Sequence, residues 1–80
     1  MKIEHDGDRW CGSFRLALET LLNDILSDGA PVAVAMTMTD GTGNYEVAGQ
    51  IERFIQDEAI VLMTNGTWHD VGEIISLEVE

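Results

Sequence analysis

Basic residues, cysteine and proline are all scarce in this chain. Its 80 residues include four Lys or Arg against 15 Asp or Glu, a formal net charge of −11, with one Cys and one Pro. A single cysteine cannot form an internal disulfide, which argues against a secreted scaffold held by disulfides. The acidic field repels phosphate groups and so disfavours nucleic acids and anionic membrane surfaces as partners. A cytoplasmic protein of the bacterial type fits these absences best. The charge is compatible with a basic protein partner, or it serves only to keep a small protein soluble.

Long apolar runs are also absent. No window approaches the roughly 18–20 apolar residues of a membrane-spanning helix. The first residues, MKIEHDGDR, are acidic where a secretory signal would be basic and then apolar. The length allows one domain, and 45% hydrophobic residues make the chain too apolar for a disordered tail. We therefore expect one small folded domain that is not attached to a membrane.

One segment near the N-terminus has the apolar period of a helix. Residues 1–12 show no period and are predicted to form a flexible arm, followed by a single helix-plus-barrel domain at residues 13–80. The helix is predicted for residues 13–28, with Ser13 as its N-cap and Gly29 as the residue that ends it. Its apolar stripe consists of Phe14, Leu18, Leu21, Leu22, Ile25 and Leu26.

Beyond residue 31 the period changes to the alternation of strands. The composition of Asp40–Asn44 and Gln56–Glu58 indicates turns, and Asn65-Gly66 indicates a type I′ hairpin turn. Gly49, within the second strand, indicates a bend or bulge. The five predicted strands cover residues 32–39, 45–54, 59–64, 67–71 and 74–80. The predicted fold is mainly β: an N-terminal helix followed by a five-stranded antiparallel small barrel.

Three features of this pattern match a known group of small barrels. They are Gly49 in the second strand, the tight turn at Asn65-Gly66, and Ile74 with Leu77 in the closing strand. Through them the span from residue 29 to residue 79 resembles the Sm-like fold, an SH3-like barrel preceded by a helix. Gly49–Ile51 and Asp70–Glu78 are also similar to the corresponding segments of the YolD-like proteins, which are short bacterial barrels. That resemblance implies an accessory role beside a DNA polymerase or another nucleic-acid enzyme.

Two positions depart from the RNA-binding members of the Sm-like group. Those members resemble one another in an Asp/Asn pair after the second strand and in a basic element in the last hairpin. Here the two places read Phe54–Glu58 and Trp68–Asp70. Neither supplies the cation, or the stacking ring with an amide, that a base pocket needs. An RNA-binding ring is therefore the weaker alternative.

The two tryptophans are the candidate anchors for a partner, because large aromatic residues often dominate interface energies. Trp68 lies beside His69 and Asp70 in a predicted strand, and these two residues are candidate partner-binding residues with it. Alternation places Trp68 and Asp70 on one face. Trp68 either projects as an anchor or covers the end of the barrel against the helix. Trp10 lies just before the helix, where it either staples the helix start or projects from the arm.

No residue cluster indicates catalysis, a metal or a cofactor. The N-terminal segment holds residue types that bind metals, but their spacing matches no zinc motif. No spacing ties a histidine to Cys11 as a nucleophile pair. The acidic C-terminal residues Glu73, Glu78 and Glu80 have no nucleophile near them in sequence. The metal-binding residue types in question are His5, Asp6, Asp8 and Cys11.

The sequence thus favours a small acidic adaptor that is not an enzyme. We expect it to bind a basic protein partner and to self-associate, because small barrels pair their edge strands readily. The alternative, from a different class, is an acidic inhibitor or nucleic-acid mimic from a mobile element, in which the net charge itself is the functional feature.

Overall fold

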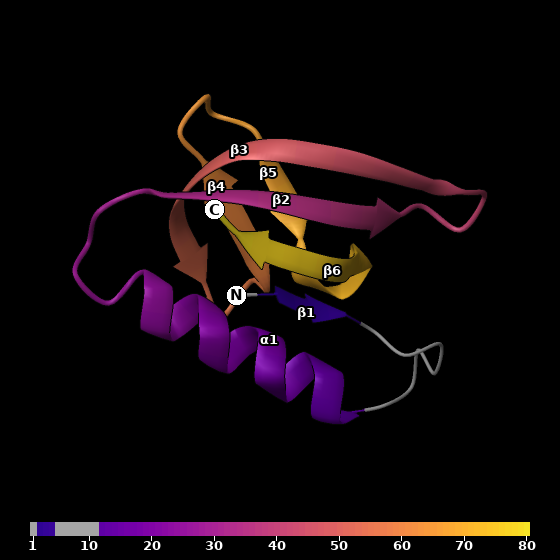
Figure 1. Ribbon diagram of the computed structural model, residues 1–80, viewed down its shortest axis with the longest axis horizontal. Helices are drawn as coiled ribbons and strands as arrows, with labels where there is room; N and C mark the ends of the chain where they lie inside the picture. Colours follow the sequence, from indigo (N-terminus) through magenta and orange to yellow (C-terminus); the bar gives the residue numbers. More distant parts are fainter. Residues whose placement is uncertain (1, 5–11) are drawn as a thin grey trace.

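The chain forms a single antiparallel sheet that is covered by one helix (Figure 1). The computed structural model describes residues 2–4 and 12–80, and of Gly12 only the backbone. A short 3-10 turn, η1 (Val71–Glu73), separates the last two strands. In chain order the other elements are β1 (Lys2–Glu4), α1 (Gly12–Ile25), β2 (Val32–Thr39), β3 (Asn44–Ile55), β4 (Ile60–Met63), β5 (Trp68–Asp70) and β6 (Ile74–Val79).

The predicted apolar stripe of α1 is the face that the helix buries. Leu18 and Leu22 are completely buried and Leu21 nearly so, whereas Leu16, outside the stripe, is 67% exposed. Figure 1 shows α1 lying along the sheet beside β1. The remaining stripe residues are half-buried and pack against the same core: Phe14, Ile25 and Leu26. The stripe prediction is confirmed because an amphipathic helix is stable only where its apolar face is covered.

The ends of α1 differ in detail from the prediction. The helix begins at Gly12, so Ser13 lies inside it and is not the N-cap. It ends at Ile25, and one further turn closes where the Gly29 amide donates to the Leu26 carbonyl oxygen at 3.1 Å. Gly29 has a φ of +79°, a left-handed conformation that glycine adopts without steric cost.

The sheet has six strands and remains open. Its order is β1-β6-β2-β3-β4-β5, and every neighbouring pair is antiparallel. The mainly β fold with one helix is confirmed, but five strands and a closed barrel are wrong. β5 is three residues long and pairs with β4 alone, while β1 extends the other edge beyond β6. β1 lies in the segment predicted as an arm, where Ile3 is the one apolar residue of three and produces no alternation.

In the central strands, every second side chain points into the core. In β2, Val34, Met36 and Met38 are buried, as predicted, with small residues on the outer face. A register shift between Ile51 and Arg53 in the pairing of β3 with β4 interrupts the simple alternation. Strict alternation would direct Arg53 inward. The shift instead turns Phe54 toward the core, so that a charged side chain is spared desolvation.

The β4–β5 turn is tight but of another type than predicted. A type I′ turn requires a positive φ at both central residues. Among the described non-glycine residues only Ala59 has one, so Asn65 does not. The Gly66 amide instead donates to the Met63 carbonyl oxygen at 3.0 Å, and Gly66 has a φ of +90°. This is a type I turn followed by a left-handed glycine, which lengthens the loop by one residue.

Gly49 marks a close approach and not a bulge. It pairs regularly with Val34, and the register shift lies beyond Ile51. A Cβ on Gly49 would lie 3.3 Å from the terminal methyl carbon of Met63. The bare backbone at this position lets the buried Met63 side chain lie across β3.

The first test of this packing compares two leucines of α1. We expect Leu22→Ala to lower the free energy of unfolding by about 2–5 kcal/mol, because it leaves a cavity in the core. Leu16→Ala removes the same atoms from an exposed position and should change stability by less than about 0.5 kcal/mol. Urea unfolding followed by circular dichroism measures both. Equal losses would contradict the assignment of the buried face.

A second test uses the strained residue in the β3–β4 turn. Ala59 has a φ of +55°, in the left-handed region that costs a residue with a Cβ about 1–2 kcal/mol. Ala59→Gly relieves this strain, but glycine also gives the unfolded chain more conformational entropy. The net effect should be a rise in the free energy of unfolding of about 0.5–1 kcal/mol.

Ala35→Gly, in the middle of β2, is the matched control. It should lower stability by roughly the same amount, because the backbone there is ordinary extended strand. Thermal unfolding of the two variants, side by side, should shift the midpoint in opposite directions.

Candidate protein-interaction surfaces

The end of β3 together with β4 and β5 presents a two-by-three grid of side chains on the outer side of the sheet. Cross-strand pairing places Arg53 opposite Leu62, and Leu62 opposite Trp68, in one row. The next row runs from β3 through β4 to β5 in the same way. It consists of Ile55, Ile60 and Asp70. We call these six residues the tryptophan face.

Trp68 is the most prominent member of the tryptophan face. It is 60% exposed and lies on β5, an edge strand of the sheet. The structure therefore does not use Trp68 to cover an end of the sheet against α1, which was one of the two alternatives. The other alternative, an anchor for a partner, stays a prediction that this exposure permits.

The structure places the other candidate partner-binding residues differently from one another. Asp70 is exposed on the tryptophan face, as alternation predicts, and its side chain makes no capping hydrogen bond to η1. His69 lies on the opposite side of β5, half-buried and across from the buried Val61. The imidazole is therefore directed away from Trp68. Trp10 lies outside the described residues.

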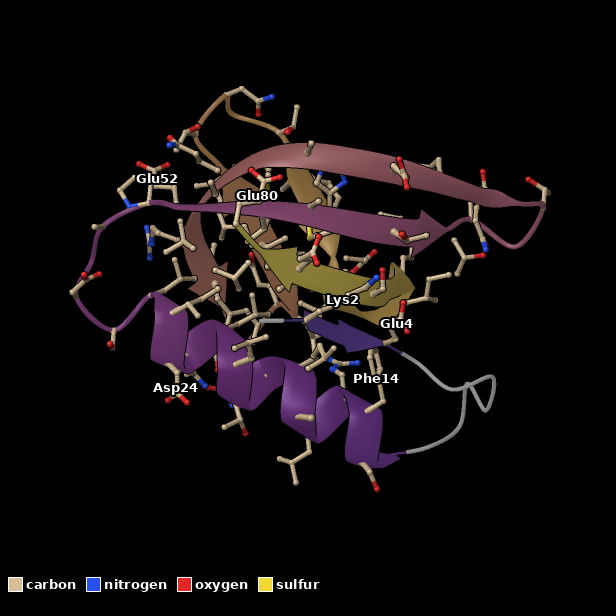
Figure 2. All side chains as sticks on the ribbon, in the orientation of Figure 1. Lys2, Glu4, Phe14, Asp24, Glu52 and Glu80 are labelled. Atoms are coloured by element: carbon tan, nitrogen blue, oxygen red, sulfur yellow. The ribbon has the colours of Figure 1, made fainter. Side chains whose placement is uncertain are left out.

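A second surface lies on the other half of the sheet. Four exposed glutamates lie on its outer side, on β1, β3 and β6 and directly after β6, with one lysine among them. Figure 2 labels Lys2, Glu4 and Glu80 of this group. Two of the glutamates, Glu46 and Glu78, and the lysine line a hollow of about 140 Å³ whose floor consists of small side chains. The floor includes Ala35, Thr37, Ala48 and Ser76. We call the four glutamates the acidic face: Glu4, Glu46, Glu78 and Glu80.

The lysine is already neutralised by its neighbours. The Lys2 ammonium lies 3.1 Å from a Glu4 carboxylate oxygen, and its cross-strand partner is Glu78. The hydrogen bond to Glu4, then the charge of Glu4 and that of Glu78, raise the pKa of Lys2 above its usual value. The acidic face thus keeps an excess of negative charge that no residue in the described part of the chain offsets.

Two further expectations from the sequence concern metal-binding clusters and membrane-spanning helices. Within residues 2–4 and 12–80, no three His, Cys, Asp or Glu side chains gather as a metal site would require. His5, Asp6, Asp8 and Cys11, the metal-binding residue types of the N-terminal segment, lie outside the described residues. No helix in the described part of the chain combines the length and apolar character needed to cross a membrane.

Comparison with family models, with curated proteins and with solved structures finds no match. The resemblance to Sm-like and YolD-like barrels therefore stays a prediction from the sequence. The role that it implies is taken up below as a proposal.

Sequence reasoning missed most of the tryptophan face. Leu62, Ile60 and Ile55 are apolar residues in short strands, and such residues usually face the core. The available signal was alternation against Val61 and Met63, which are the buried residues of β4. Because β4 has four apolar residues in succession, the sequence alone did not show which two of them face outward.

The exposure of Trp68 leads to a stability test. Trp68→Ala should lower the free energy of unfolding by about 1 kcal/mol, well short of the roughly 3–5 kcal/mol of a buried aromatic residue. Chemical unfolding followed by far-ultraviolet circular dichroism measures the difference. A loss in the larger range would mean that Trp68 belongs to the core in solution.

Proposed function

We propose that this chain is a small, acidic, non-enzymatic interaction protein that binds a basic surface on a protein partner. The observation that supports this most directly is the acidic face, where four glutamates are exposed and two of them, Glu46 and Glu78, line a hollow with a floor of small side chains. Charge of one sign on a surface steers an oppositely charged partner toward it and increases the association rate.

The shape of the acidic face favours a protein partner. Ala35, Ala48 and Ser76 let a partner's side chains come close to the sheet, while Glu46 and Glu78 stand at the rim of the hollow. Long basic side chains suit this arrangement, because their alkyl stems can lie on the small residues while their charged ends reach the carboxylates. Nucleic acid is disfavoured, since its phosphates would meet the glutamates.

The resemblance to YolD-like proteins suggests which partner this is. It implies a role beside a DNA polymerase or another nucleic-acid enzyme. Such enzymes present basic surfaces because they bind phosphate backbones. An acidic adaptor in the bacterial cytoplasm would dock on such a surface or next to it.

An acidic inhibitor that mimics nucleic acid is the second candidate. It is favoured by exposed acids that lie away from the acidic face: Asp24 on α1, Asp28 beyond it, and Asp57 and Glu58 in the β3–β4 turn. A mimic would use this distributed charge as a whole, whereas an adaptor would depend on one face.

Two double variants with the same net charge separate these candidates. Glu46→Gln/Glu78→Gln removes two charges from the acidic face, and Asp57→Asn/Glu58→Gln removes two from the distant turn. We expect the first to weaken binding to a labelled oligolysine peptide by roughly threefold to tenfold, and the second by less than about twofold. Fluorescence anisotropy at physiological salt measures both, and the native partner recovered by pull-down is then tested with the same pair.

The outcomes have distinct meanings. Equal weakening by the two double variants would favour the mimic, since net charge alone would then decide binding. Binding of uridine-rich RNA at physiological salt would contradict the acidic-adaptor proposal and support the Sm-like ring. Failure of every variant and of the wild type to bind oligolysine would exclude a basic partner.

A further inference from the structure

We propose that the tryptophan face is the place where two copies of this chain pack against each other, sheet on sheet. This surface is separate from the acidic face, and its assignment does not depend on the proposed basic partner. The argument rests on three observations: the apolar composition of the face, its lack of a cover, and the placement of its two charges.

The tryptophan face is apolar but takes no part in the core. Ile55, Ile60 and Leu62 are half-buried, yet none of them belongs to the core cluster or packs against it. Their cross-strand neighbours are one another, Arg53, Asp70 and Trp68, and Trp68 is 60% exposed. β4 and β5 are the last two strands of the sheet order, and β5 pairs with β4 alone. A contiguous apolar area of this kind on a small domain indicates a contact surface.

The charge of the face distinguishes a second copy from a basic partner. The chain as a whole has a formal charge of −11, whereas the tryptophan face holds one cation, Arg53, and one anion, Asp70. A strongly basic partner gains nothing from a neutral surface and is drawn to the acidic face. Two acidic copies, by contrast, can approach each other only where each presents little net charge.

The two charges lie at diagonally opposite corners of the grid. Among the described residues Arg53 forms no ion pair, since the ion pairs there involve Lys2 and Arg15. A two-fold axis in the plane of contact, with the strands of the two sheets steeply crossed, brings Arg53 of each copy to Asp70 of the other. The same rotation stacks Trp68 on Trp68 of the second copy. The face is therefore complementary to itself.

Salt should affect this dimer and the basic partner in opposite directions. Raising the ionic strength from about 0.1 M to about 1 M shortens the screening length from about 10 Å to about 3 Å. Screening weakens the attraction between the acidic face and oligolysine. It relieves the repulsion between two copies of charge −11 and leaves the apolar contact intact. Failure of one proposal is thereby distinguishable from failure of the other.

The test is the molar mass of the full chain by sedimentation equilibrium over a wide range of concentration and at both ionic strengths. We expect a reversible dimer that tightens with salt. Leu62→Glu and Trp68→Ala should each weaken it by roughly tenfold or more, because each removes an apolar contact of the face. Leu16→Glu is the matched control, since Leu16 is as exposed as Trp68 but lies on α1, and it should leave the mass unchanged.

A charge exchange tests the two-fold geometry. Arg53→Asp and Asp70→Arg should each weaken the dimer by roughly tenfold, since each brings like charges together in both symmetric contacts. The double variant has the charge of the wild type and should restore the dimer to within about threefold. Far-ultraviolet circular dichroism of each variant checks that it is folded.

Three results would overturn the proposal. A wild-type chain that stays monomeric at every concentration and salt would exclude it. So would a dimer that persists in folded Leu62→Glu and Trp68→Ala variants, because the contact would then lie elsewhere. A double charge variant as weak as the single ones would exclude the crossed two-fold arrangement. If a monomeric chain binds another protein and Leu62→Glu abolishes that binding, the face belongs to a different partner.

Discussion

The burial of the α1 leucines against the inner side of the sheet is the contact on which the rest of this structure depends. Leu18 and Leu22 meet the inward rows of β2 and its neighbours, where Val34, Met36 and Leu77 are almost completely buried. A chain of 80 residues has only one such core, and little apolar surface is left over to stabilise anything else. The two edge strands β1 and β5, which add no buried residue to this core, have only three residues each.

The position of β2 at the centre follows from that core. β2 is paired along most of its length on both sides, with β3 and with β6. Its inner row is apolar and its outer row consists of Ala and Thr, so its outer side is flat. The glutamates of the acidic face come from the strands beside it and at the sheet edge. Because the centre is flat, charge at the rim is free to meet a partner that lies across the sheet.

A single register shift separates the two candidate surfaces. It lies between Ile51 and Arg53, where the pairing partner of β3 changes from β2 to β4. Before the shift, Glu46 is on the acidic face. After it, Arg53 begins the near-neutral tryptophan face. The sheet order places β1 and β5 at opposite edges, so the proposed basic partner and the proposed second copy would occupy different ends of one sheet.

Several features of the fold followed from the sequence alone, because they depend on neighbours along the chain. The helical stripe from Phe14 to Leu26 and the bounds of β2 were predicted from apolar period, which local backbone geometry imposes. The net charge of −11, and with it the proposal of a basic partner, also required no coordinates.

Other features were decided only by tertiary structure, because they depend on which segments meet. Whether the sheet closed was set by the length of β5 and by β1 adding to β6, both contacts between distant parts of the chain. A one-residue shift in β3 reversed the sides of Arg53 and Phe54, since strand faces alternate with a period of two. Sequence determined that Trp68 lies in a strand. Tertiary structure decided that its face stays uncovered, because the helix is occupied by the core on the other side of the sheet.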